Sequence, residues 1–291
     1  MLVTVIITFY SKDKGVLVKA VQSALAQTYY NINVIVIDDY SPVCAISELL
    51  NIKDPRLNII KNDYNLGMAA SINKAIELSS GDVIAFLDYD DIWFPFKIAE
   101  QIKLYKSESN EKCVIYSQAS IISRGIEYIK PKSSIAYDDN ITDYLFCKSG
   151  FIQTSGMMLS RNVALAVKMD LFKRHTDYQY CISLSNYGCY FKMLNKASYK
   201  HVVTPKLVDY NMSIDWLSKY EVYFTENSKM AFRNGVILRL IMKHHHYLTA
   251  FKYANENNIT FINFIKAFFI NFAIENLPQT IVSTFTKLKN I

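Results

Sequence analysis

The chain is poor in the residues that mark several classes of protein. Its five cysteines form no CxxC pair and are odd in number, which fits reduced thiols in the cytoplasm better than a disulfide framework or a zinc site. Glycine is also scarce, and only Gly15 precedes Gly67. The GxGxxG fingerprint of a dinucleotide-binding domain is therefore absent.

Long apolar runs are missing as well. The longest candidate, residues 259–274, is interrupted by Asn263, Lys266 and Asn271, whereas a membrane-spanning helix needs about 20 apolar residues in a row. Met1 leads directly into an apolar segment without a basic stretch before it, so we expect no secretory signal. These absences predict a cytoplasmic protein without a transmembrane helix.

The residues that are abundant indicate a folded protein. Of the 291 residues, 51% are hydrophobic, with 21 Tyr and 17 Phe, which argues against disorder. The net charge is +6, and residues 225–291 hold eight Lys or Arg against three Glu, so this segment carries five of the six charges. Charge concentrated in one segment predicts a local anionic partner, and we expect no nucleic acid.

The N-terminal half alternates predicted strands and helices. Runs of β-branched and aromatic residues predict strands, and apolar residues at intervals of three and four predict helices. Such alternation predicts an α/β fold with a doubly wound, mainly parallel, Rossmann-like sheet. The expected strands cover residues 3–9, 33–37, 57–60 and 83–87, and the expected helices lie at 17–25 and between Gly67 and Gly81.

The second half departs from this alternation. Residues 123–144 are polar and irregular, which is typical of loops around an active site. From about Trp216 the chain is predicted to be almost wholly helical. The other expected elements are helices at 97–105 and 177–187, a strand at 113–122 and a strand within 150–159.

Three carboxylates, Asp88, Asp90 and Asp91, follow the expected strand at 83–87. In open α/β sheets, ligands bind beyond the carboxyl ends of the strands, and carboxylates there can hold a hard divalent cation that in turn holds a diphosphate. The alternative is a solvated acidic turn after a core strand. Taken alone the pattern leaves both interpretations open, and the rest of the chain favours a metal–nucleotide site.

Four segments in a fixed order carry a family resemblance. They are VTVIITFYS (3–11), VIVIDDYS (34–41), NLGMAASINKAI (65–76) and GDVIAFLDYDDIW (81–93). Over residues 1–215 this set resembles the family 2 glycosyltransferases, inverting nucleotide-sugar enzymes of the GT-A fold and here of the bacterial surface-polysaccharide type. A fifth segment, HTDYQYCISLSNYG (175–188), is similar to the Glu-Asp region of the family, with Thr176 in place of the usual Glu.

The resemblance implies a divalent cation, Mn²⁺ or Mg²⁺, at the carboxylate cluster. Asp90 would ligate the ion directly, and Asp88 would bind the ribose or complete the metal shell. The cation acts as a Lewis acid that neutralises the charge developing on the leaving diphosphate. Asp91 is expected to cap the following segment and to face the acceptor side.

The resemblance also implies a nucleotide-sugar site that includes Thr8, Tyr10, Asp39, Asp88 and Tyr89. Asp39 would accept a hydrogen bond from the uracil N–H or lie near the ribose, because an ionised carboxylate only accepts. Thr8 would contact the base, and the Tyr10 ring would flank it. The alternatives are a turn or helix cap at Asp39, a strand-terminal Thr8 without a ligand, and a Tyr10 that packs on the core.

Asp177 is the candidate general base. In inverting transfer, the acceptor hydroxyl attacks the anomeric carbon in line with the departing diphosphate, and a positioned carboxylate removes its proton. Asp170 and His175 are nearby alternatives for the base. Asp177 has an alternative role as a helix N-cap.

We therefore predict an inverting hexosyltransferase with a GT-A domain at 1–215 and a basic helical extension at 216–291. Its donor would be a nucleotide-sugar, with UDP favoured, and its acceptor a hydroxyl of a glycan or lipid-linked glycan. The alternatives are a nucleotidyltransferase of similar fold and a non-catalytic sugar- or partner-binding module. The sequence leaves open whether the protein forms a homo-oligomer.

The last part of the chain predicts a membrane contact. Aromatic and apolar residues recur there at helical spacing on one face, and the basic residues lie nearby. We expect residues 259–291 to contact an anionic membrane surface at the inner face of the cell membrane; the alternative is packing on the catalytic domain or a second subunit. The apolar face consists of Phe261, Phe264, Ile265, Phe268, Phe269 and Phe272.

Overall fold

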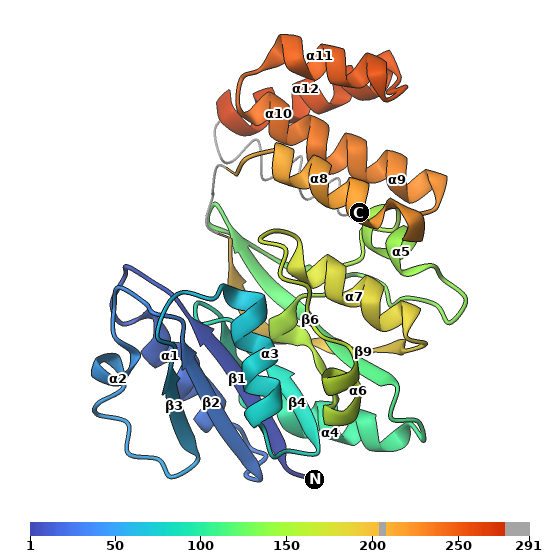
Figure 1. Ribbon diagram of the computed structural model, residues 1–291. Coiled ribbons are helices and arrows are strands. Elements are labelled where there is room, and N and C mark those ends of the chain that lie inside the picture. The colour runs from blue at the N-terminus through green and yellow to red at the C-terminus, as the bar shows by residue number, and fades with distance from the viewer. Residues whose placement is uncertain (204–207, 277–291) are drawn as a thin grey trace. The chain divides into compact units, whose positions relative to one another are not determined.

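The computed structural model describes residues 1–203 and 208–276, which form two compact units (Figure 1). The first unit comprises residues 1–122, 127–141 and 150–202. The second comprises residues 123–126 and 142–149 and the chain from residue 203 onward. The division into a transferase domain at 1–215 and an extension at 216–291 stays a prediction.

The first unit is built on one sheet of nine strands. Its order is β3-β2-β1-β4-β8-β6-β9-β5, and β7 pairs with β6. The first four strands are parallel because a helical crossover connects each of them to the next. They coincide closely with the four strands predicted from β-branched runs. These strands are β1 (Val3–Phe9), β2 (Ile32–Asp38), β3 (Leu57–Lys61) and β4 (Val83–Phe86).

Helices cover both faces of this parallel half. Alternate residues of β1, from Val3 to Phe9, share one core with Leu17 and Val21 of α1 (Val16–Leu25). Helix α3 (Met68–Leu78) also contacts β1 but buries residues outside that core. Because successive side chains of a strand point to opposite faces, the sheet is doubly wound, as predicted.

The second half of the sheet is mixed. Strand β8 is antiparallel to both β4 and β6, and β9 is parallel to β6. Strand β5 is antiparallel to β9. The elements of this half are β5 (Ile92–Trp93), α4 (Lys97–Ser107), β6 (Cys113–Ser123), β8 (Met158–Ser160), α6 (Arg161–Ala166), α7 (Thr176–Asn186) and β9 (Tyr190–Val202).

Residues 123–144 are more regular than predicted. Arg124 and Gly125 have positive φ angles of 53° and 76°, which is the backbone of a tight hairpin turn. The turn connects β6 to β7 (Ile126–Lys130), and α5 (Ile141–Phe146) follows. The prediction of an irregular segment is wrong for residues 126–130 and 141–144, because a two-residue turn is enough to pair the short strand β7 with β6. Residues 131–140 contain no helix or strand, as predicted.

The second unit is helical. Trp216, Phe224 and Phe232 form an aromatic core with Phe146 of α5, and their ring centroids lie 5.0–6.0 Å apart. This confirms the predicted C-terminal helical region. Its helices are α8 (Asn211–Tyr220), α9 (Glu226–Phe232), a π-helical segment (Arg233–Leu238), α10 (Arg239–Lys243), α11 (Tyr247–Glu256) and α12 (Phe261–Asn276).

The apolar face of α12 is divided. Phe264 and Phe268 lie against Phe251 and Tyr247 of α11, with centroids 5.8 and 5.7 Å apart. Three other phenylalanines of α12 are exposed to solvent. The exposed fractions of Phe261, Phe269 and Phe272 are 70%, 61% and 51%. Residues 277–291 of the predicted membrane contact lie outside the described residues. Across 1–203 and 208–276, no helix has the length and apolarity required to cross a membrane.

Candidate active site

The predicted donor residues meet at one edge of the sheet. Strand β1 lies between β2 and β4 in parallel register, with Thr8 beside Ile37. The carboxyl ends of all three strands therefore share an edge, and the order of the strands changes direction there, which is where open α/β sheets bind ligands. Thr8, Tyr10, Asp39 and Asp88 all lie at or just beyond these ends.

Asp39 holds the loop that opens α3. Its Oδ1 accepts hydrogen bonds from Leu66 N and Asn62 Nδ2, and its Oδ2 accepts one from Gly67 N, each at 2.8 Å. The Asn65 side chain donates to the Asp39 carbonyl at 3.1 Å. An ionised carboxylate accepts about four hydrogen bonds, so Asp39 retains capacity for a ligand. Its contact with uracil stays a prediction.

The other predicted donor residues differ in their surroundings. Tyr10 is exposed and Thr8 is half-buried. The Tyr89 ring packs edge-on against Phe9, with centroids 5.4 Å apart, and burial raises the pKa of its hydroxyl, which is hydrogen-bonded to Ser11. The Tyr89 contact connects the ends of β1 and β4. Binding of nucleotide by these residues stays a prediction.

Asp88 is held by a short 3₁₀ turn, η1 (Thr154–Gly156). Its Oδ1 accepts from Thr154 Oγ1 at 3.0 Å and its Oδ2 from Gln153 Nε2 at 3.1 Å, while its own N–H donates to Ser155 Oγ at 3.0 Å. Burial raises the pKa of Asp88 well above its usual range, and the charges of Asp91, Asp177 and Asp90 raise it further. The four carboxylates therefore form one electrostatic cluster.

Asp177 belongs to the same cluster through the same turn. Its Oδ1 accepts from the Thr154 backbone N–H at 3.3 Å. Burial raises the pKa of Asp177, against the hydrogen bonds from Thr154. The N-cap of α7 is His175, with φ of 56°, so Asp177 lies in the first turn and is not the N-cap. Turn η1 thus connects the predicted base to Asp88.

The two alternative bases are less suited to the role. Burial and the Arg174 charge lower the pKa of His175 to about 3, which makes it a weak base, and its ring stacks on Tyr178 at 5.5 Å. The backbone N–H of Asp170 donates to Gln179 Oε1 at 2.9 Å, whereas Asp177 is among the charges that raise the pKa of Asp88 most. Asp177 is therefore the favoured candidate.

His201 also contacts the carboxylate cluster, although the sequence analysis did not predict it as a site residue. Its Nδ1 lies 2.8 Å from Asp91 Oδ1 and 3.3 Å from Gln153 Nε2. Burial acts to lower the pKa of His201, but the hydrogen bond and charge of Asp91, with the charges of Asp88 and Asp90, outweigh it and raise the pKa overall. Asp91 is an ion-pair partner of His201, and its role as a cap of the following segment stays a prediction.

Buried polar side chains hydrogen-bond the backbone carbonyl groups of turn η1. Trp93 Nε1 donates to Ser155 O at 2.8 Å, and Gln101 Nε2 donates to Gly156 O at 2.7 Å. A Cβ at Gly156 would lie 3.0 Å from the Tyr199 ring, so glycine allows the close approach of β9. These contacts fix the turn that positions Asp88 and Asp177.

Lys97 is a fully buried lysine in this support. Its Nζ donates to Gln101 Oε1 at 2.5 Å and lies 4.2 Å from the Trp93 ring centroid. Burial lowers the pKa of Lys97 well below its ordinary value. The folded protein therefore holds Lys97 neutral at pH values where the unfolded chain holds it charged.

We expect Lys97→Met to change how stability depends on pH. Between the lowered folded pKa and the unfolded pKa of about 10.4, the unfolded wild-type chain binds one proton more, so its free energy of unfolding rises with pH. This rise, at most about 1.4 kcal/mol per pH unit, should be lost in Lys97→Met and kept in the control Lys103→Met, whose side chain is exposed on the same helix. Urea unfolding at a series of alkaline pH values measures the free energy of unfolding. If this free energy depends on pH in the same way for wild type and Lys97→Met, the prediction is contradicted.

The donor set fits a hard divalent cation. Asp88 and Asp90 supply carboxylate oxygens, which Mg²⁺ and Mn²⁺ prefer, and Asp91 Oδ2 is buried without a hydrogen-bond partner. In the described ranges, no three His, Cys, Asp or Glu side chains are grouped to hold an ion by themselves. Mg²⁺ usually binds one or two carboxylates together with substrate phosphates, so Asp88 and Asp90 stay the predicted ligands.

Comparison with solved structures identifies the fold. The structure of S. aureus TarS 1–349 in complex with UDP-GlcNAc matches with a TM-score of 0.57 and 13% identity, over 92% of this chain and 90% of that one. Its complex with UDP matches with a TM-score of 0.56. The expected GT-A-like fold with a helical C-terminal region is confirmed.

Comparison of sequences then identifies the family. The model for glycosyl transferase family 2 matches residues 4–167, more than half of the chain, and the chain belongs to this family. The amylovoran biosynthesis glycosyltransferase AmsB of Erwinia amylovora is 28% identical over 79% of this chain and 81% of its own length. A β-1,3-glucosyltransferase, WfaP of Escherichia coli, is 42% identical over 37% of this chain and 42% of its own length.

Proposed function

We propose that the protein transfers a sugar from a nucleotide donor, with UDP favoured, to a hydroxyl of a growing glycan, with inversion at the anomeric carbon. The observation that carries the proposal is the carboxylate cluster of Asp88, Asp90, Asp91 and Asp177 at the switch point of the sheet. One turn, η1, hydrogen-bonds both Asp88 and Asp177. A donor-side group and an acceptor-side group are thereby held in one frame, as direct displacement requires.

Each carboxylate has a distinct role in this proposal. Asp88 and Asp90 would hold Mg²⁺ or Mn²⁺, which supplies Lewis-acid neutralisation of the leaving nucleoside diphosphate. Asp177 would take the proton of the attacking hydroxyl on a carboxylate oxygen. Its pKa is raised by burial, which brings its basicity closer to that of an ideal general base near neutral pH. No covalent intermediate is needed, because one displacement inverts the configuration.

The names of relatives support the choice of substrates. WfaP is named as a UDP-Glc:α-D-GlcNAc-diphosphoundecaprenol glucosyltransferase, and TarS has been solved with UDP-GlcNAc. By analogy, we assign this chain a UDP-sugar donor and a lipid-linked glycan acceptor. We further propose that the protein acts in the cytoplasm, at the inner face of the cell membrane.

A thermal-shift screen tests the donor assignment. A ligand that binds only the folded state raises the apparent stability of the protein. We expect at least one UDP-sugar to raise the melting temperature in the presence of Mn²⁺, with a much smaller rise in EDTA. If only unmodified nucleoside triphosphates raise the melting temperature, the result would favour a nucleotidyltransferase instead.

The exposed part of α12 predicts membrane binding. Burial of one phenylalanine side chain contributes roughly 1.5–3 kcal/mol, and each nearby Lys or Arg adds about 1 kcal/mol at an anionic surface. The double variant Phe261→Ser/Phe269→Ser should therefore lose most co-sedimentation with anionic liposomes. The control Val222→Ser, at a residue of the same unit that is 79% exposed, should bind like the wild type. A wild-type protein that stays in the supernatant at low salt would refute the membrane contact.

A further inference from the structure

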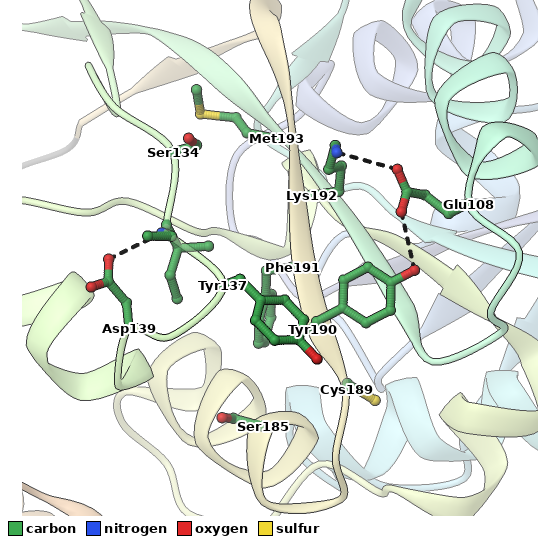
Figure 2. A pocket seen from close by; sticks show the side chains of 12 residues that line it. Glu108, Ser134, Tyr137, Asp139, Ser185, Cys189, Tyr190, Phe191, Lys192 and Met193 are labelled. Carbon is green, nitrogen blue, oxygen red and sulfur yellow. Dashed lines mark hydrogen bonds and ion pairs between the residues drawn. The ribbon is translucent and has the colours of Figure 1, made fainter.

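A cavity of about 500 Å³ lies in the first unit, away from the carboxylate cluster. It is lined at β9 by Tyr190 and the three residues that follow (Figure 2). His201, which contacts the cluster, lies near the other end of the same strand. At about 3.3 Å per residue, the strand separates the two by roughly 30 Å, so the cavity is a different site.

Three aromatic residues are among those that line the cavity. Tyr190 and Phe191 come from β9, and Tyr137 comes from the loop before α5. Tyr137 is 89% exposed, so it contributes little to the core of the unit. Ligand pockets typically combine aromatic faces with a few convergent polar groups, and an aromatic ring offers a flat apolar face on which the C–H face of a sugar ring can stack.

The polar groups of the cavity suit a neutral, hydroxyl-rich ligand. The Glu108 carboxylate accepts from Tyr190 Oη at 3.2 Å and lies 3.3 Å from Lys192 Nζ (Figure 2). Asp139 Oδ2 accepts from Ala136 N at 3.0 Å. With two carboxylates and one ammonium among its lining residues, the cavity carries a net negative charge, which disfavours phosphate. Sugar hydroxyls both donate and accept and can use all three charged groups.

The backbone adds a further set of partners. In the first few residues of β9, from Tyr190 to Met193, only one edge is paired, with β6. Strand β5 pairs with the opposite edge at Tyr199 and Lys200, and the described residues place no other strand there. The backbone N–H and C=O groups of that edge, next to the cavity, are available to hydrogen-bond a ligand.

We propose that this cavity binds a neutral oligosaccharide, as a glycan-binding site separate from the site of transfer. The choice of a glycan rests on the proposed function, in which the acceptor is a growing sugar chain. The cavity would hold sugar residues of that chain well behind the reacting end. A site of this kind keeps a long acceptor bound between transfers and raises its effective concentration at the carboxylate cluster.

Methyl NMR of the full chain, labelled at methionine, tests the proposal. Met193 lines the cavity, so its methyl signal reports on occupancy. The probes are maltohexaose, cellohexaose, laminarihexaose and chitohexaose, titrated to millimolar concentration. We expect at least one of them to shift the Met193 signal saturably. If none moves it, or if UDP moves it as strongly, the proposal is overturned.

Matched variants locate the binding. Tyr137→Ala should weaken binding of the active hexasaccharide by roughly tenfold, because it removes a stacking face. Tyr30→Ala, at a tyrosine of the same unit that is 81% exposed and outside the cavity, should bind like the wild type. Equal affinity in Tyr137→Ala and wild type would overturn the proposal.

A third variant separates this inference from the proposed function. Asp90→Asn should keep wild-type hexasaccharide affinity while losing nucleotide-sugar turnover. If turnover is present but no hexasaccharide binds, the cavity assignment fails and the proposed function stands. If hexasaccharides bind and no nucleotide-sugar is turned over, the proposed function fails and the cavity assignment stands.

Discussion

Replacing Asp90 by asparagine should abolish sugar transfer and most of the metal-dependent binding of UDP. The substitution keeps the shape of the side chain but removes the negative charge that a hard divalent cation requires. Asp90 is half-buried in the turn after β4, so the fold should survive. Initial rates and calorimetric titration with UDP, each with and without Mn²⁺, measure the two effects.

The control for Asp90→Asn is Asp138→Asn, which removes an exposed carboxylate outside the cluster. This control should keep wild-type activity, because an isolated surface charge contributes little. Full activity of Asp90→Asn would show that Asp90 is not a required metal ligand. Full activity of the wild type in excess EDTA would remove the metal itself from the mechanism.

Replacing Asp177 by asparagine should lower the rate of transfer by roughly 10² to 10⁴, the usual contribution of general base catalysis. The asparagine oxygen can still accept the hydrogen bond from Thr154 N, so turn η1 should keep its position. The loss should appear in kcat, with little change in the KM for the donor. Asp170→Asn should retain activity. A collapse of donor binding in Asp177→Asn would instead indicate a structural role.

Much of the fold follows from local sequence. Strand β1 runs from Val3 to Phe9 as predicted, because an uninterrupted buried run of β-branched residues has few other conformations available. The carboxylates after β4 were also recognisable, since Asp88, Asp90 and Asp91 follow a strand in a βα alternation. Short-range patterns were sufficient to predict the alternation of strands and helices and the sheet edge at which these carboxylates lie. The family was predicted from the resemblance of four segments to known glycosyltransferases.

The support of the site depends on long-range pairing and could not be predicted in the same way. Strand β9 carries lysines and an asparagine among its apolar residues, and its register with β6 shifts at Ser117 and Gln118. Strand β9 therefore shows no regular alternation of apolar and polar residues. Neither the strand nor the site residue His201 within it was predicted. Thr154 contacts Asp88 and Asp177, which are 66 and 23 residues away in sequence. Only the folded sheet brings them together.

The sequence pattern of helix α12 was also only partly informative. Helical spacing predicted one apolar face on α12, but spacing alone does not say what covers it. Phe264 and Phe268 pack on α11, whereas Phe261 and Phe269 are exposed. The prediction of an apolar face therefore divides into a packing contact within the second unit and an outer surface on which the membrane proposal depends.

Release of UDP from a panel of UDP-sugars tests the central claim most directly, because slow donor hydrolysis needs no knowledge of the acceptor. Wild-type protein and Asp90→Asn would be compared with Mn²⁺ and with EDTA. We predict Mn²⁺-dependent UDP release by the wild type for at least one sugar, and none by Asp90→Asn. Release of pyrophosphate from nucleoside triphosphates with no UDP release, or equal UDP release by wild type and Asp90→Asn, would contradict the account.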